Sequence, residues 1–69
     1  MIVNLYYVRF PRADMDGLNV LVKITKTEFA RLFELFTPTK PPVITRKNGL
    51  KEIVYNCLAF ELIHKTKTD

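Results

Sequence analysis

Two hairpin signals, one on each side of a single helix signal, constrain the fold of this chain more than any other feature. Asp16-Gly17 and Asn48-Gly49 are dipeptides suited to the positive φ angles of two-residue hairpin turns. Between them, Thr25-Lys26-Thr27-Glu28 is a capping box, in which the Thr and Glu side chains satisfy each other's backbone amides at a helix start. The sequence therefore predicts an α+β fold. We expect a two-layer ββαββ arrangement, with one helix packed on a four-stranded, largely antiparallel sheet.

The predicted strands differ in how clearly they separate two faces. Residues 18–25 show the clearest period-2 pattern in the chain, with apolar residues at every even position and Leu21 as the one apolar residue among the others, which is typical of a half-buried strand. Residues 1–10 are apolar on both faces, which favours a central strand, with Ile2, Tyr6, Val8 and Phe10 on one face and Val3, Leu5 and Tyr7 on the other. Residues 43–47 and 50–55 flank the second turn. The apolar pattern continues to Ile63, too far for one regular strand, so we expect a bend or bulge near residues 56–59.

A single helix signal, together with the length of the chain, predicts one small domain. Phe29, Leu32, Phe33 and Phe36 follow helical spacing and predict a core-facing stripe. Pro38 ends the helix, and residues 39–42 form an extended linker. Sixty-nine residues leave room for one core. We expect one α+β domain over residues 1–65 and a frayed C-terminal tail over residues 66–69.

The surplus of apolar strand residues predicts a binding surface. One helix covers only one face of a sheet, so apolar side chains should remain on the other face, and such patches usually mark interfaces. We expect Tyr6, Tyr7, Leu21 and Tyr55 to contribute. This favours a non-enzymatic protein-binding module that uses an open sheet face or a strand edge, with a protein partner or a second copy in a homodimer. An accessory or inhibitor-type protein of a phage or mobile element fits this size.

The charge pattern supports an alternative function. Eleven basic residues against seven acidic ones give a net charge of +4. Arg46, Lys47 and Lys51 surround the second turn, and a basic hairpin tip can grip phosphates or enter a DNA groove. The same charges can instead keep a solvated turn from pairing edge to edge. Arg9 and Arg12 extend the basic surface if the first strand lies close. The alternative is therefore a small basic nucleic-acid-binding domain, less favoured because the charges look dispersed among acids.

No residue pattern predicts catalysis or metal binding. Cys57 and His64 are seven positions apart and would point to opposite faces of one regular strand, so ordinary packing is the expected role of both. One Cys and one His cannot form a four-ligand zinc site. Asp14 and Asp16 lack the further oxygen ligands of a Ca²⁺ loop and are expected to form a turn. We expect no enzymatic activity, cofactor or small-molecule substrate.

The sequence also predicts a chain that stays in water. No apolar run approaches the roughly 20 residues that span a bilayer. The first residues lack the charged leader of a secretory signal. A single cysteine excludes an intrachain disulfide. We therefore expect a cytoplasmic location with no membrane contact.

Overall fold

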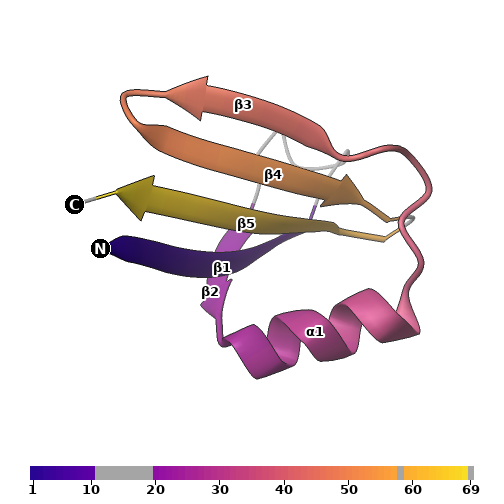
Figure 1. Cartoon of the computed structure of the whole chain (residues 1–69). Helices are drawn as coiled ribbons and strands as arrows, with labels where there is room; N and C mark the ends of the chain where they lie inside the picture. Colours follow the sequence, from indigo (N-terminus) through magenta and orange to yellow (C-terminus); the bar gives the residue numbers. More distant parts are fainter. Residues whose placement is uncertain (11–19, 58, 69) are drawn as a thin grey trace.

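The computed structural model describes residues 1–10, 20–57 and 59–68 of the chain, and shows five strands and one helix (Figure 1). In chain order these are β1 (Ile2–Phe10), β2 (Val20–Ile24), α1 (Lys26–Leu35), β3 (Val43–Lys47), β4 (Leu50–Asn56) and β5 (Glu61–Thr68). The strands form one antiparallel sheet in the order β2-β1-β5-β4-β3. The predicted α+β class is confirmed, whereas the predicted number of four strands is wrong.

The fifth strand arises because the chain reverses where the sequence predicted only a bend. Asn56, the last residue of β4, lies opposite Glu61, the first residue of β5. The reversal is closed by the Cys57 amide, which donates to the Phe60 carbonyl oxygen at 2.9 Å. No Gly or Pro marks this reversal in the sequence, so the continuous apolar pattern looked like one long strand.

Strand β1 lies next to β2 on one side and β5 on the other. Its pairing with β5 runs from Ile2 opposite Thr68 to Arg9 opposite Glu61. Residues 66–68, expected as a frayed tail, therefore belong to a strand. They are ordered because the first residues of β1 offer them backbone partners. This position between two strands also accounts for the apolar character of β1 on both faces.

The second predicted turn forms as expected. Lys47 pairs with Leu50, which leaves a two-residue turn. Asn48 has a φ of 52° and Gly49 a φ of 77°, and these positive values are what the hairpin turn requires. The first predicted turn, Asp16-Gly17, lies outside the described residues. Strands β1 and β2, which flank it, are nevertheless paired antiparallel.

The predicted capping box is present at the start of α1. The Glu28 amide donates to Thr25 Oγ1 at 3.1 Å, and the Thr25 amide donates to Glu28 Oε1 at 3.0 Å. These two hydrogen bonds with Thr25 lower the pKa of the Glu28 carboxyl. The Phe36 amide closes the last turn on the Leu32 carbonyl oxygen at 2.9 Å. In the part of the chain that the structure describes, no helix has the length and apolar character needed to cross a bilayer.

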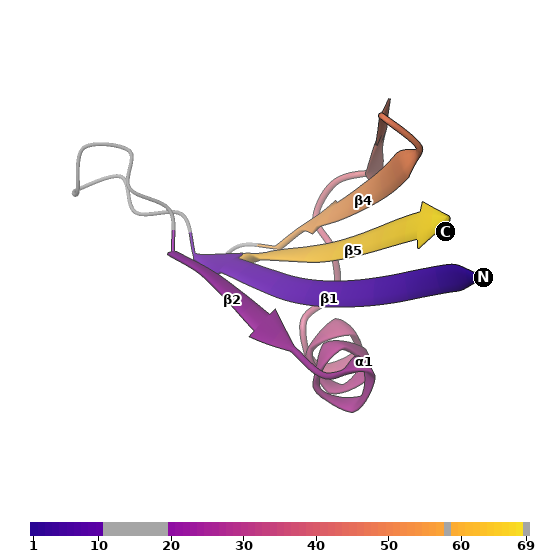
Figure 2. The ribbon, with the colours of Figure 1, turned by 90° about the vertical axis from the view of Figure 1, so that its left-hand side faces the viewer.

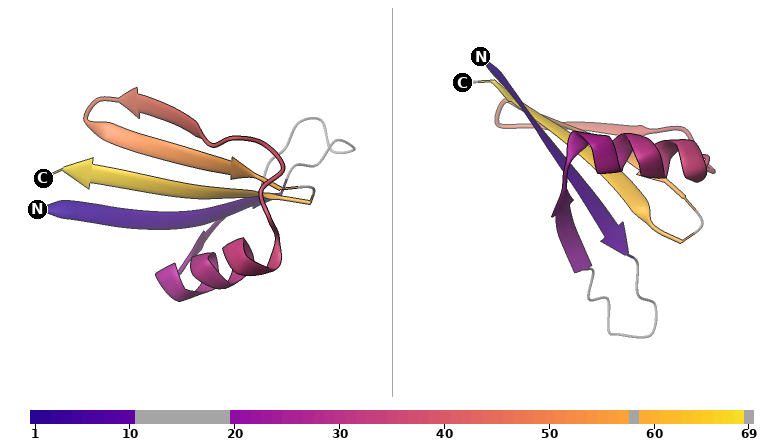
Figure 3. Two further views of the ribbon diagram at one scale, coloured as in Figure 1. Left: turned by 45° about the vertical axis from the view of Figure 1, so that its right-hand side comes forward. Right: turned by 90° about the horizontal axis from the view of Figure 1, so that it is seen from below.

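The core lies between α1 and the middle of the sheet. Val8, Phe60 and Leu62 are buried there, with Phe29 and Leu32 of the helix packed against them. Helix α1 lies beside β1 and β2, away from β3 (Figures 2 and 3). The apolar stripe of α1 is only partly covered by the sheet. Phe33 and Phe36 keep 38% and 45% of their surface exposed. The prediction that the whole stripe is core is wrong for these two residues.

Candidate nucleic-acid interface

The strand register decides which predicted interface residues lie under the helix. Tyr6 pairs with Ile24 and His64, and its ring lies 5.1 Å from that of Phe29. Tyr55 contacts the ring of Phe33 at 5.0 Å. Tyr6 and Tyr55 therefore lie on the face that α1 packs against, and not on the open face as expected. Sequence alternation separates two faces of a strand but does not say which one a helix covers.

The other two predicted interface residues lie on the opposite face, which we call the open face. Tyr7 pairs with Lys23 and Ile63, and Leu21 pairs with Arg9. Leu21 is 48% exposed. The Tyr7 ring carries the Lys65 ammonium 5.1 Å from its centre, a cation–π distance. The open face is thus apolar in its middle and partly covered by a lysine.

Basic side chains gather at one end of the sheet, which we call the hairpin end. Here the β3–β4 turn, the last residues of β5 and the first residues of β1 lie side by side (Figure 1). The register places Lys67 opposite Leu50 and Lys65 opposite Glu52. Among the described residues of this end, Glu52 is the one acid, and the cations are Arg46, Lys47, Lys51, Lys65 and Lys67. Charges that look dispersed in the sequence are therefore concentrated by the fold.

The lysines of β5 are the part of this surface that sequence reasoning missed. Lys65 and Lys67 were assigned to a frayed tail or its border, so their charges were not added to the turn. The available signal was their spacing of two, which places both on one face of a strand. Recognition of that strand depended on the reversal after Asn56, which the sequence did not mark.

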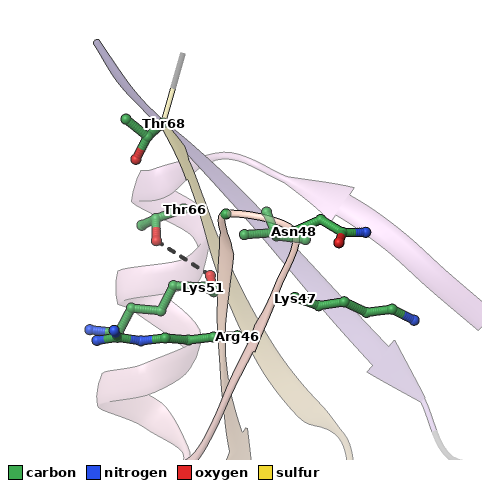
Figure 4. Close-up of a pocket in the computed structure, with 8 residues that line it drawn as sticks. Arg46, Lys47, Asn48, Lys51, Thr66 and Thr68 are labelled. Carbon is green, nitrogen blue, oxygen red and sulfur yellow. Dashed lines mark hydrogen bonds between the residues drawn. The ribbon is translucent and has the colours of Figure 1, made fainter.

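The cations of the hairpin end point to both sides of the sheet. Arg46 and Lys51 extend to the side on which α1 lies, whereas Lys47 extends to the other side (Figure 4). Thr66 anchors this arrangement, because its hydroxyl donates to the Lys51 carbonyl oxygen at 3.3 Å. Together they border an open hollow of about 400 Å³, lined by Arg46, Lys47, Asn48, Gly49, Leu50, Lys51, Thr66 and Thr68.

Arg46 and Lys51 form a like-charge pair across two strands. They are directly opposite each other in the register, an arrangement that destabilises a sheet. Within the described residues, neither side chain forms an ion pair, and the salt bridge found there joins Arg9 to Glu61. Like charges in this arrangement oppose folding, and no described carboxylate is paired with either of them.

Arg9 does not extend the basic surface. Its guanidinium donates to Glu61 Oε2, at 2.7 Å from Nε. The pairing of Arg9 with Glu61 lies seven residues along β1 from that of Ile2 with Thr68. At about 3.3 Å per residue, this separates Arg9 from the hairpin end by roughly 23 Å. Arg12, the other predicted extension, lies outside the described residues.

The fold does not favour insertion of the hairpin into a DNA groove. Strand β5 continues to Thr68 beside the turn, and the Leu50–Lys67 pair lies next to it. The turn is therefore flanked by β5 on the side of β4, while β3 is the edge strand, and it does not project as a free ribbon (Figure 1). A major groove accepts a two-stranded ribbon, whereas this end is wider. Contact with phosphates at the surface remains compatible with the geometry.

His64 and Cys57, the two side chains that were considered for chemistry near neutral pH, have ordinary packing contacts. His64 Nε2 lies 3.0 Å from Asn4 Oδ1, and its ring stacks on Tyr6 at 4.7 Å. Burial, and then the positive charge of Lys51, lower the pKa of His64. The Cys57 thiol lies 3.4 Å from the Phe36 carbonyl oxygen, and burial raises its pKa.

Metal ligands do not gather in the part of the chain that the structure describes. There, no three side chains of His, Cys, Asp or Glu come close enough to hold an ion. Asp14 and Asp16 lie outside it.

Comparisons with known protein families, with curated proteins and with solved structures find no match to this chain.

Proposed function

We propose that the protein is a small non-enzymatic domain that binds the phosphate backbone of nucleic acid at its hairpin end. The observation that carries this proposal is the convergence of five cations with one acid at that end of the sheet. Lys and Arg contacts to phosphates release condensed counterions and supply most sequence-independent affinity. The fold brings together charges that are dispersed in the sequence, and this supports nucleic-acid contact over protein contact.

The proposed contact reads the backbone rather than the bases. Within the described residues of the hairpin end, no side chain is aromatic, so bases find no stacking platform there. Arg46 and Lys51 extend to one side of the sheet and Lys47 to the other, so a strand that crosses the end of the sheet meets cations on both sides (Figure 4). Phosphate contacts position a strand but carry no sequence information. We therefore expect little preference among sequences.

The experiment compares two variants that lose the same charge. In the hairpin-end variant, Arg46, Lys47 and Lys51 are replaced by Gln. In the charge-matched control, Lys26, Arg31 and Lys40 are replaced by Gln, all exposed positions on the helix or linker. Anisotropy of labelled single- and double-stranded DNA and RNA measures affinity. We expect the first variant to bind at least tenfold more weakly and the control to bind nearly as the parent, since each lost phosphate contact weakens binding.

Two results contradict the proposal. If the parent protein binds none of these nucleic acids at low salt, the hairpin end is not a backbone-binding surface. If the two variants lose affinity equally, the effect comes from net charge alone and not from the arrangement of cations.

Protein binding through the open face is a second candidate function, favoured by its exposed apolar residues. Leu21 and Val43 are 48% and 50% exposed. Val43 begins a row across the sheet that continues with Val54, Ile63 and Tyr7. This candidate includes a two-layer arrangement in which α1 covers one face and leaves the other for a partner protein or a second copy. Ile63 is buried within this row at 1% exposure, so the apolar surface of the open face lies on either side of it, and exposed apolar patches are typical of interfaces.

Sedimentation velocity tests the homodimer form of this second candidate. If a second copy covers the open face, the parent protein sediments as a dimer at high concentration, and Leu21→Glu makes it a monomer. A parent protein that stays monomeric at millimolar concentration contradicts the homodimer.

A further inference from the structure

We infer that the hollow on the α1 side of the hairpin end is a seat for a phosphate monoester. This group is found at the end of a nucleic-acid strand and on phosphorylated small molecules. The inference rests on the proposed function, because it assigns a preferred ligand group to the same surface. It adds that the site distinguishes a terminal phosphate from the phosphates within a strand.

The first reason is the charge of the site. Arg46 and Lys51 are opposite each other, and their cationic groups extend together to the α1 side (Figure 4). A phosphate within a strand carries one negative charge, whereas a monoester carries about 1.5 to 2 at pH 7. Two adjacent cations without a described carboxylate partner match the second group better. A bound dianion also removes the repulsion between the two side chains.

The second reason is the set of hydrogen-bond donors. The Arg46 guanidinium offers a planar fork that fits two phosphate oxygens, and the Lys51 ammonium adds a point charge. Thr66 and Thr68 lie on the neighbouring strand, two residues apart and thus on the same face. The Thr66 hydroxyl donates to the Lys51 carbonyl oxygen. Among the described residues the Thr68 hydroxyl has no hydrogen-bond partner, so it can donate to a phosphate oxygen.

The third reason is the shape of the hollow. The β3–β4 turn borders it at one end and β5 borders it along one side (Figure 4). A strand that passes through such a site has to leave in two directions, whereas a strand end has to leave in only one. Its volume of about 400 Å³ falls within the range of small-ligand sites. The geometry therefore suits a terminal phosphate with its adjoining sugar.

The test uses three oligonucleotides of one sequence, with a 5′-phosphate, with a 3′-phosphate and with neither. Anisotropy competition measures their affinities for the full chain. We expect at least one phosphorylated form to bind about tenfold more tightly than the unphosphorylated form, as one added charge-assisted contact provides. The R46Q/K51Q variant should lose this ratio. The K65Q/K67Q variant, with the same loss of charge at two positions that do not line the hollow, should weaken all three affinities and keep the ratio.

Further arms separate the sources of the phosphate and the two proposals. Equal affinity for all three oligonucleotides overturns the seat and leaves backbone binding intact. If no oligonucleotide binds, the proposed function fails. In that case, a nucleoside monophosphate or inorganic phosphate is added and the amide NMR signals of Lys51 and Thr66 are followed. Shifts of these signals support the seat as a site for the phosphate of a small molecule. Absence of those shifts overturns the seat as well.

Discussion

The substitution Lys51→Glu should make the protein more stable and its nucleic-acid binding weaker. Lys51 lies directly opposite Arg46, so the change replaces a like-charge pair with an opposite-charge pair. Opposite-charge cross-strand pairs contribute about 0.2–1 kcal/mol, and like charges oppose folding by similar amounts. Arg46 is exposed and Lys51 half-buried, so solvent screens both effects. We therefore expect a gain of about 0.5–1 kcal/mol in the free energy of unfolding.

Urea unfolding and thermal melting measure the gain in stability. For a domain of this size, 0.5–1 kcal/mol corresponds to a rise in Tm of about 2–8 °C. Lys51→Gln, which removes the repulsion without adding attraction, should give about half the gain. Both gains should shrink at high salt because the charges are exposed. If the hairpin end had only a structural role, Lys51→Glu would not weaken nucleic-acid binding.

Two results for Lys51→Glu would contradict this prediction. If Lys51→Glu unfolds at a lower urea concentration than the parent, the Arg46–Lys51 pair is not destabilising in the folded chain. If the variant is more stable but binds nucleic acid as before, the cost of the pair is not connected with binding.

Three further predictions concern the core, the helix cap and the histidine. Leu62→Ala should lower the free energy of unfolding by about 2–5 kcal/mol in urea, because Leu62 has no exposed surface. A loss of this size would unfold much of the population of so small a domain. A loss below about 1 kcal/mol contradicts the place of Leu62 in the core. Thr25→Ala should cost about 1 kcal/mol and reduce helix content by circular dichroism, since it removes the cap for the Glu28 amide; unchanged stability argues against a working cap. The pKa of His64 should lie below 6.5 by NMR titration, because burial and Lys51 disfavour its charged form, and Lys51→Glu should raise it. A lowered pKa means that the unfolded chain binds more protons than the folded chain. The contribution of His64 to stability is therefore complete above pH 6.5 and is lost as the pH falls through the pKa of His64 in the folded chain. Stability that increases on acidification through this range contradicts the assignment.

Local signals in the sequence were sufficient for the elements that depend on neighbouring residues. The capping box at Thr25 and Glu28 and the turn at Asn48-Gly49 form as predicted, because both depend on side chains or φ angles within four residues. The alternation of residues 18–25 likewise predicted the strand observed as β2.

Features that depend on tertiary placement were beyond the sequence pattern. Tyr6 and Tyr7 alternate plainly, yet only the position of α1 shows that Tyr6 is covered and Tyr7 open. The reversal between Asn56 and Glu61 has no turn residues to mark it. Without it, Lys65 and Lys67 appear to belong to a tail, although the register brings them to the basic turn. The candidate site was thus predicted for Arg46, Lys47 and Lys51 and missed for the β5 lysines.

The salt dependence of nucleic-acid binding reports how many phosphates the cations of the hairpin end contact. Five phosphate contacts predict a slope of log Kobs against log salt near −3.5 for a single strand, at about −0.7 per contact. Replacement of Arg46, Lys47 and Lys51 by Gln should reduce the slope to about −1.4. The charge-matched replacement of Lys26, Arg31 and Lys40 should leave it near −3.5. Equal slopes for the two variants would contradict the claim that the fold assembles a phosphate-binding surface at the hairpin end.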